Sequence, residues 1–193
     1  IVLKDDDLDE ARSNALLVFE TINNRGMDLQ DADIFKAKLY YMSLSVGKGE
    51  EFKEQWKNLI SRCDDLDLKI DDLFRYYYHI IRGKEGIVIA EKRLREFFQK
   101  DPKSPFKTGG YEIVLDDLQK TLDAIEEYYY KRTEPTRLGA WLQVLDAYTN
   151  QNPVYALIVF LYFHKETTDD ALIEFLKKVL RYCYYRGSTM SVK

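Results

Sequence analysis

The sequence has few residues of the types that build metal centres and disulfide frameworks. It contains two histidines and two cysteines in 193 residues, and neither Cys63 nor Cys183 has a CxxC partner. A zinc site or a disulfide framework is therefore not indicated, and we expect both cysteines to be thiols in the core. Proline and glycine are scarce as well, with four and nine copies. Few positions therefore interrupt regular structure.

Excess positive charge and long hydrophobic runs are also missing. The chain has 29 Lys and Arg and 33 Asp and Glu, so its net charge is -4. This charge excludes a general attraction to nucleic acid or to an anionic membrane. No apolar run approaches the ~20 residues that span a bilayer. The start, IVLKDDDLDE, has neither the basic nor the apolar part of a signal peptide. We expect a soluble cytoplasmic protein with no membrane partner.

What the sequence does have favours helices. Hydrophobic residues make up 46% and charged residues 32% of the chain, and their spacing follows helical periodicity almost throughout. We predict an all-α fold of about nine helices in one helical array. The expected helices cover approximately residues 7–24, 31–46, 50–63, 70–80, 87–98, 111–131, 136–148, 153–163 and 169–185. Ile1-Val2-Leu3 looks like the remnant of a strand, and the start at Ile1 suggests a fragment of a longer protein.

The domain organisation follows from the clearest interruption in the chain, the loop DPKSPFKTGG at residues 101–110. We predict a single helical domain over residues 1–193, with a subdivision into 1–100 and 111–193 as the alternative. The expected helix 111–131 has one apolar stripe, which is typical of an amphipathic helix at a core. The expected helix 153–163 is apolar almost all round through VYALIVFLYF, which predicts a central buried helix.

The most informative stretch, residues 19–38, joins two expected helices through a short turn. Gly26 ends the first helix because it adopts a positive φ without a steric penalty. Leu29 and Ile34 fit a hydrophobic staple around an N-cap at Gln30, and acidic residues follow in the first turn. Helix capping and packing alone therefore account for the pattern.

The same stretch resembles a known family, the GmrSD-type modification-dependent restriction proteins. Their pattern F-E-x-(I/L)-N-x-R-G-x-x-L-(S/T)-x-x-D-(I/L)-x-K is matched here by Phe19, Glu20, Ile22, Asn23, Arg25, Gly26, Leu29, Asp33, Ile34 and Lys36. Gln30 departs from the pattern, because the family has Ser or Thr at that place. The resemblance covers about twenty residues and implies that the chain is the helical region that follows a ParB/sulfiredoxin-like nucleotide domain.

The resemblance implies a role without catalysis for this chain. The DGQQR loop of the family's nucleotide domain and the His-Asn-His nuclease segment of many relatives do not occur in it. We therefore expect no catalytic residue, metal or cofactor here, although the parent would use a nucleoside triphosphate and a divalent metal to cleave DNA in phage defence. Its partners would be an upstream nucleotide domain and a downstream effector domain of the same polypeptide. The residues expected to face the nucleotide domain are Phe19, Glu20, Asn23, Arg25, Gly26, Asp33 and Lys36.

A DNA-binding helix-turn-helix is another interpretation of this stretch, with the recognition helix beginning at Asp31. Charge argues against it. Asp28, Asp31 and Asp33 would approach the phosphates at the start of that helix, and like charges repel there.

Tyrosine is unusually abundant, with 15 copies, and clusters in FRYYYHIIR, EEYYYKR and RYCYYR. Three consecutive helical residues sweep about 200° of the circumference, so the rings of one triplet do not all face one stripe. Either the tyrosines line the rim of the core with their hydroxyls in water, or they form a surface with their basic neighbours that docks another domain or stacks a single-stranded base. The candidate surface comprises Tyr76, Tyr77, Tyr78, Tyr128, Tyr130, Arg181 and Arg186. It also supports the alternative function, a free-standing helical protein–protein interaction module.

Enzyme motifs for nucleotide, zinc or serine chemistry do not occur in the sequence. His79 and His164 have no metal-ligand neighbours along the chain. The acidic pairs mostly lie at expected helix starts, where negative charge complements the helix dipole.

Overall fold

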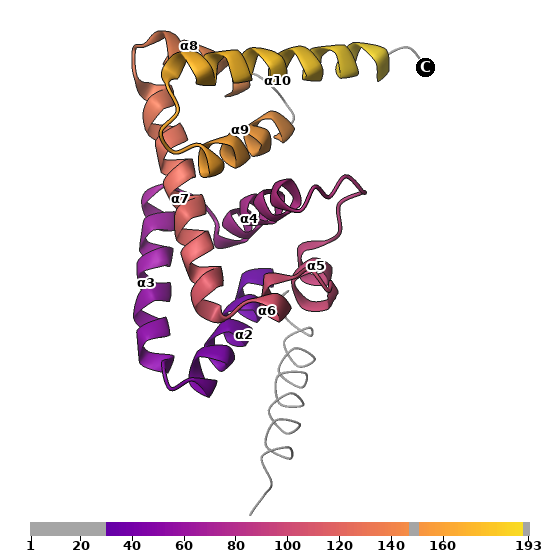
Figure 1. Ribbon diagram of the computed structural model, residues 1–193. Helices are drawn as coiled ribbons and strands as arrows, with labels where there is room; N and C mark the ends of the chain where they lie inside the picture. Colours follow the sequence, from indigo (N-terminus) through magenta and orange to yellow (C-terminus); the bar gives the residue numbers. More distant parts are fainter. Residues whose placement is uncertain (1–29, 147–150, 191–193) are drawn as a thin grey trace, which may run out of the picture.

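The structure is a computed structural model that describes residues 30–146 and 151–190 (Figure 1). The all-α prediction is confirmed, since the described residues form helices and no strand, and the number of helices is close to the nine expected. The helices are α2 (Asp31–Ser45), α3 (Gly49–Asp65), α4 (Ile70–Lys84), α5 (Leu94–Lys100), α6 (Pro105–Thr108), α7 (Tyr111–Thr133), α8 (Arg137–Asp146), α9 (Asn152–Phe163) and α10 (Asp169–Met190). The expected strand remnant 1–3 and helix 7–24 lie outside the described residues. No helix in the described ranges has the length and apolar character needed to cross a bilayer.

The long helix α7 connects the two ends of the molecule. It contacts α2, α3 and α4 as well as α8 and α9, and it runs from α2 and α6 at one end to α8 at the other (Figure 1). Val114, Leu118, Leu122 and Ile125 are buried on one face of α7, as the apolar stripe in the sequence predicts. A single hydrophobic cluster includes residues from both sides of the segment 101–110.

Phenylalanine rings form the centre of the core near α2. Phe35 of α2 lies 4.8 Å from Phe74 of α4 and 5.0 Å from Phe98 of α5, measured between ring centroids. Phe106 of α6 adds a fourth ring at 5.1 Å from Phe98. All four side chains are buried, so short helices separated in sequence are joined by tilted and edge-to-face ring contacts.

The helix expected at residues 87–98 begins only at Leu94. Gly86, with φ +60°, ends α4 by a turn in which the Ile87 N–H donates to the Arg82 carbonyl oxygen at 2.9 Å. The following residues 87–93 are not helical, and the β-branched run that they contain has a low helix propensity. The prediction of helix over this segment is therefore wrong.

Two side chains of α4 hold this segment in place. The Arg82 guanidinium donates to the Ile89 carbonyl oxygen at 2.6 Å, and the Lys92 backbone N–H donates to the Tyr78 hydroxyl at 3.0 Å. Val88 and Ile89 are consequently turned outward, with 94% and 61% of their surface exposed. The helical periodicity of the sequence does not predict these contacts.

Two further differences concern the ends of helices. The loop 101–110 contains the single turn α6, where Ser104 accepts a hydrogen bond from the Phe106 N–H and Pro105 occupies the first turn. The helix expected to stop near residue 185 continues to Met190.

Candidate functional site

The predicted motif is only partly within the described structure. Phe19, Glu20, Asn23, Arg25 and Gly26 lie outside the described residues. Asp33 and Lys36 lie one turn apart on α2 and are exposed, whereas Ile34 between them is buried. Gln30 is the N-cap residue of α2, as predicted, although its side chain makes no capping hydrogen bond.

The start of α2 is capped by an aspartate from another helix. Asp71 of α4 accepts a hydrogen bond from the Ala32 N–H at 2.7 Å, and Arg95 of α5 donates to Asp31 at 2.9 Å. Burial, together with the charges of nearby aspartates, raises the pKa of Asp71. Negative charge is therefore concentrated where a recognition helix would approach phosphates, which argues against the helix-turn-helix interpretation.

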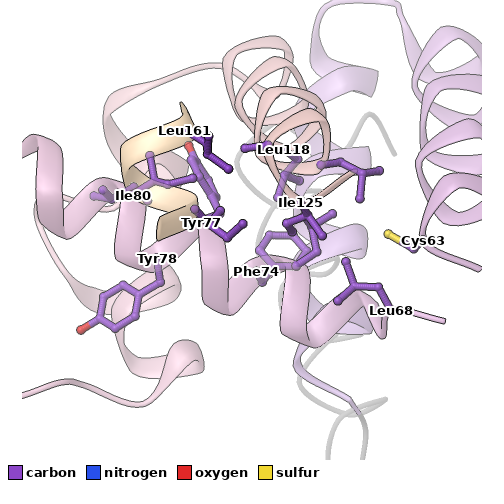
Figure 2. Packing of buried hydrophobic residues seen from close by; sticks show 14 of the residues in the cluster. Cys63, Leu68, Phe74, Tyr77, Tyr78, Ile80, Leu118, Ile125 and Leu161 are labelled. Carbon is purple, nitrogen blue, oxygen red and sulfur yellow. The ribbon is translucent and has the colours of Figure 1, made fainter. Parts of the chain in front are cut away.

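Three members of the predicted tyrosine surface are buried in the core. Tyr77, Tyr78 and Tyr128 are 1%, 3% and 3% exposed, and Figure 2 shows the Tyr78 ring pointing away from Leu118 and Ile125. The prediction that these three lie on a docking or nucleic-acid surface is therefore wrong. The alternative of a core rim also needs correction, because the hydroxyls of Tyr77 and Tyr78 bond to protein groups.

The Tyr77 hydroxyl belongs to a hydrogen-bonded group that links three helices. Tyr77 of α4 and Tyr162 of α9 donate to the two oxygens of Asp117 on α7, at 2.9 and 2.8 Å. Burial raises the pKa of both tyrosines, so both hydroxyls keep their protons at neutral pH. One carboxylate thereby holds α4, α7 and α9 together.

The remaining members of the predicted surface are dispersed. Tyr76 is half-buried and packs edge-to-face against Tyr155 at 5.2 Å. Tyr130 and Arg181 are exposed, but they lie on α7 and α10 respectively. The Arg186 side chain lies outside the described residues. The structure does not bring the predicted set together as one surface.

The face of α9 that points away from the core borders the candidate site. Val154, Leu157, Ile158 and Leu161 are buried, but the opposite side of the helix is half-open and Phe163 is 46% exposed. The prediction of a helix buried all round is therefore wrong for one side of α9.

A groove of about 510 Å³ occupies the space between this face of α9 and α4. At the wall of the groove, α4 and α9 come close together at Gly83, because a Cβ on this residue would lie 3.0 Å from Val159 Cγ1. The groove has a volume typical of small-molecule sites. Its lining comprises His79, Arg82, Gly83, Glu91, Asn152, Tyr155, Ala156, Val159, Phe160, Phe163, His164 and Phe175. Both histidines of the chain therefore lie at one site.

His79 forms the inner part of the groove. Its ring stacks on Tyr155 at 4.1 Å with an interplanar angle of 16°, and its side chain is 13% exposed. Nε2 is covered and has no hydrogen-bond partner among the described residues, because the nearest carboxylate oxygen, of Glu91, is 3.8 Å away. Burial lowers the pKa of His79; the Glu91 carboxylate acts in the opposite direction, and Arg82 and Arg75 lower the pKa by smaller amounts. The ring is therefore neutral at neutral pH.

His164 ends a stack of three rings at the outer part of the groove. Phe160 lies 4.2 Å from Phe175 and 4.4 Å from His164, with interplanar angles of 21° and 13°. Two rings this close and this parallel to Phe160 occupy its opposite faces. The His164 Nδ1 lies 3.0 Å from the Phe160 carbonyl oxygen, so Nδ1 carries the proton and donates. In the neutral ring Nε2 is then an acceptor.

The arrangement is suited to binding a planar group. It offers stacking faces, the acceptor atoms of His164 and Glu91, and the cation of Arg82 within one groove. No cluster of three or more His, Cys, Asp or Glu side chains that would hold a metal ion occurs in the described part of the chain. Cys63 is buried in the core, as expected, and burial raises the pKa of its thiol to about 11, whereas Cys183 is only partly covered.

This groove could not be predicted from the neighbours of each histidine along the chain. His79 and His164 are distant in sequence, and only the packing of α4 against α9 brings them to one site. One local signal exists: Phe160 and His164 are four residues apart, which puts their rings on the same helix face.

Comparisons with protein families, with curated proteins and with solved structures find no match to this chain.

Proposed function

We propose that the chain is a non-catalytic helical domain of a GmrSD-like restriction protein, and that α2 packs against an upstream nucleotide-hydrolysing domain. The division of the motif on α2 supports this proposal. Ile34 is buried and serves the fold, whereas Asp33 and Lys36 are exposed on the adjacent surface. The Lys36 ammonium lies 6.0 Å from the centre of the Trp56 ring, and its exposed charge and that of Asp33 are available for contact with another domain. Nucleotide hydrolysis and DNA cleavage, with their nucleotide and divalent metal, belong to the flanking domains in this proposal.

The other end of the molecule suits the positioning of a downstream effector domain. Helix α10 lies at the opposite end from α2 (Figure 1). Tyr182, Tyr184 and Tyr185 on its last turns are 61%, 69% and 63% exposed, and tyrosine is enriched at protein interfaces. These exposed rings also favour the second candidate, a free-standing interaction module that binds a protein through α10.

The first experiment is to sequence the source DNA on both sides of the segment that encodes Ile1 to Lys193. An upstream DGQQR-like loop supports the domain proposal, with or without a downstream His-Asn-His segment. A start codon directly before Ile1 and a stop codon after Lys193 would contradict it and leave the free-standing module. Hydrolysis of ATP or GTP by the purified chain, above a heat-inactivated control, would contradict the non-catalytic role.

The docking surface is tested by reversing two charges on α2. Asp33→Lys with Lys36→Glu should weaken binding of the separately produced upstream domain by about tenfold or more, because the charges would become repulsive. Glu54→Lys with Lys57→Glu is the matched control, since this acidic and basic pair is also exposed and three residues apart, on α3. Calorimetric titration measures both variants. Equal losses in the two variants, or none in either, would refute the α2 interface.

A further inference from the structure

The groove between α4 and α9 presents two stacks of partly buried rings. In one stack His79 lies on Tyr155, and in the other Phe175, Phe160 and His164 follow one another. His164 is exposed at the end of its stack. A further planar ring placed on His164 would continue a series whose spacings are 4.2 and 4.4 Å. Proteins that bind single-stranded nucleic acid commonly gain affinity by stacking its bases on such rings.

A carboxylate lies beside these rings. Glu91 lines the same groove and its side chain is 53% exposed. A carboxylate accepts hydrogen bonds, so it fits a ring that carries an amino group.

Cations lie on the α4 side of the groove. The Arg82 guanidinium makes hydrogen bonds to the Tyr78 hydroxyl and the Ile89 carbonyl oxygen, and a guanidinium has five N–H donors, so donors remain for a ligand. Arg75, two turns before Arg82, is exposed and near enough to act on His79. The Arg82 guanidinium in the groove complements an anionic group, and phosphate matches its geometry, while Arg75 adds positive charge beside the groove.

We propose that this groove binds a nucleobase that carries a phosphate, supplied either as a free nucleotide or as a unit of a single-stranded nucleic acid. The ring stacks on the exposed face of His164, the amino group of the base donates to Glu91, and the phosphate meets Arg82, with the charge of Arg75 beside the groove adding to the attraction. This inference does not rest on the docking role of α2, because the groove lies on α4 and α9.

The chain provides its own reporter for this site, because its two histidines both line the groove. The imidazole proton resonances of the full chain are followed by NMR during titration with dCMP, dTMP or inorganic phosphate. His164→Gln assigns the two signals. We expect dCMP to shift both, and inorganic phosphate to leave the His164 signal in place. The affinity for dTMP, which lacks the amino group, should be about fivefold lower, the size of one hydrogen bond.

The opposite results would overturn the proposal. If dCMP at millimolar concentration shifts neither signal, the groove does not bind a nucleotide. If dCMP and inorganic phosphate give the same shifts, only the anion is bound. Equal affinities for dCMP and dTMP would refute the contacts to the amino group.

Two exposed side chains test the contacts without disturbing the core. Phe163→Ala removes a ring from the wall of the groove and Arg75→Gln removes a charge beside it, and each should weaken dCMP binding by about three- to tenfold. Tyr130→Ala and Lys57→Gln are the matched controls, because both residues are exposed and lie outside the groove. If the controls weaken binding as much as the groove variants, the groove is not the site.

The source of the base is settled by comparing dCMP with a short oligo(dC). A higher affinity for the oligonucleotide, which declines as salt is added, assigns the groove to single-stranded nucleic acid. Equal affinity per site assigns it to a free nucleotide.

Discussion

Two aromatic regions of this chain use similar rings in different ways. Around Phe35, rings from four helices meet at tilted and edge-to-face angles, and all of them are buried. In the groove, His79 lies nearly parallel to Tyr155 and His164 nearly parallel to Phe160, and the second of these stacks ends at the surface with His164. Tilted rings interlock and fill space, whereas parallel rings leave a flat face at the end of the stack. The first region therefore holds the fold together, and the second is built to accept a further ring.

The sharpest test of this comparison removes one ring from each region. Phe35→Ala should lower the free energy of unfolding by about 3–5 kcal/mol, because it leaves a cavity at the meeting point of four helices. Phe163→Ala, at the 46% exposed edge of the groove, should cost about 1 kcal/mol or less. Urea titration followed by circular dichroism measures both. Similar costs for the two variants would show that the groove belongs to the core.

The second test concerns the carboxylate that connects the two regions. Tyr77 stacks on Phe98 in the phenylalanine region, and its hydroxyl shares Asp117 with Tyr162 of α9. Tyr77→Phe or Tyr162→Phe alone should cost about 1 kcal/mol, the value of one hydrogen bond. The double variant should cost more than the sum of the two, because Asp117 then has neither donor. Additive losses in urea titrations would mean that Asp117 finds other partners.

The sequence predicted the parts of this molecule that depend on local periodicity. The stripe from Val114 to Ile125 on α7 is buried as its spacing indicates, because one helix face contacts one core. The helix predicted at residues 87–93 does not form, because Arg82 and Tyr78 of α4 bind this segment through hydrogen bonds. Helical spacing carries no information about such a contact.

The candidate site was harder to predict than the fold. A continuous apolar run such as that of α9 does not reveal which of its sides a neighbour covers, so the half-open face next to Phe163 was predicted to be buried. The tyrosine triplets show the converse, since Tyr77 and Tyr78 were candidates for a surface and are buried. Their hydroxyls are satisfied by Asp117 and by the Lys92 backbone, and these partners come from distant parts of the chain.

The third test uses the pKa of His79, whose side chain is 13% exposed. The phenylalanine region contains no histidine. Burial lowers the pKa of His79 in the folded state below the unfolded value of about 6.5. Between the two pKa values the unfolded chain binds more protons, so this contribution to stability is complete above about pH 6.5 and is lost as the pH falls through the folded pKa. The slope from one group cannot exceed about 1.4 kcal/mol per pH unit.

Urea titrations at a series of pH values measure this slope, and His79→Gln should reduce it. His164→Gln is the control, because His164 lines the same groove but is exposed. Asp71, whose pKa is raised by burial, acts in the opposite direction and at lower pH, in the range where carboxyl groups titrate. An unchanged slope in His79→Gln would show that His79 is not desolvated in the folded chain.

The smallest expected effect comes from the end of the three-ring stack. His164→Ala removes an exposed ring and its hydrogen bond to the Phe160 carbonyl oxygen, which should cost only about 0.5–1 kcal/mol. Phe160→Ala should cost more, because Phe160 is half-buried and lies between two rings. Thermal unfolding followed by circular dichroism compares the two variants. If His164→Ala costs as much as Phe160→Ala, then the last ring stabilises the fold as the buried phenylalanines do. A small cost is the result expected of a ring whose outer face is available to a ligand.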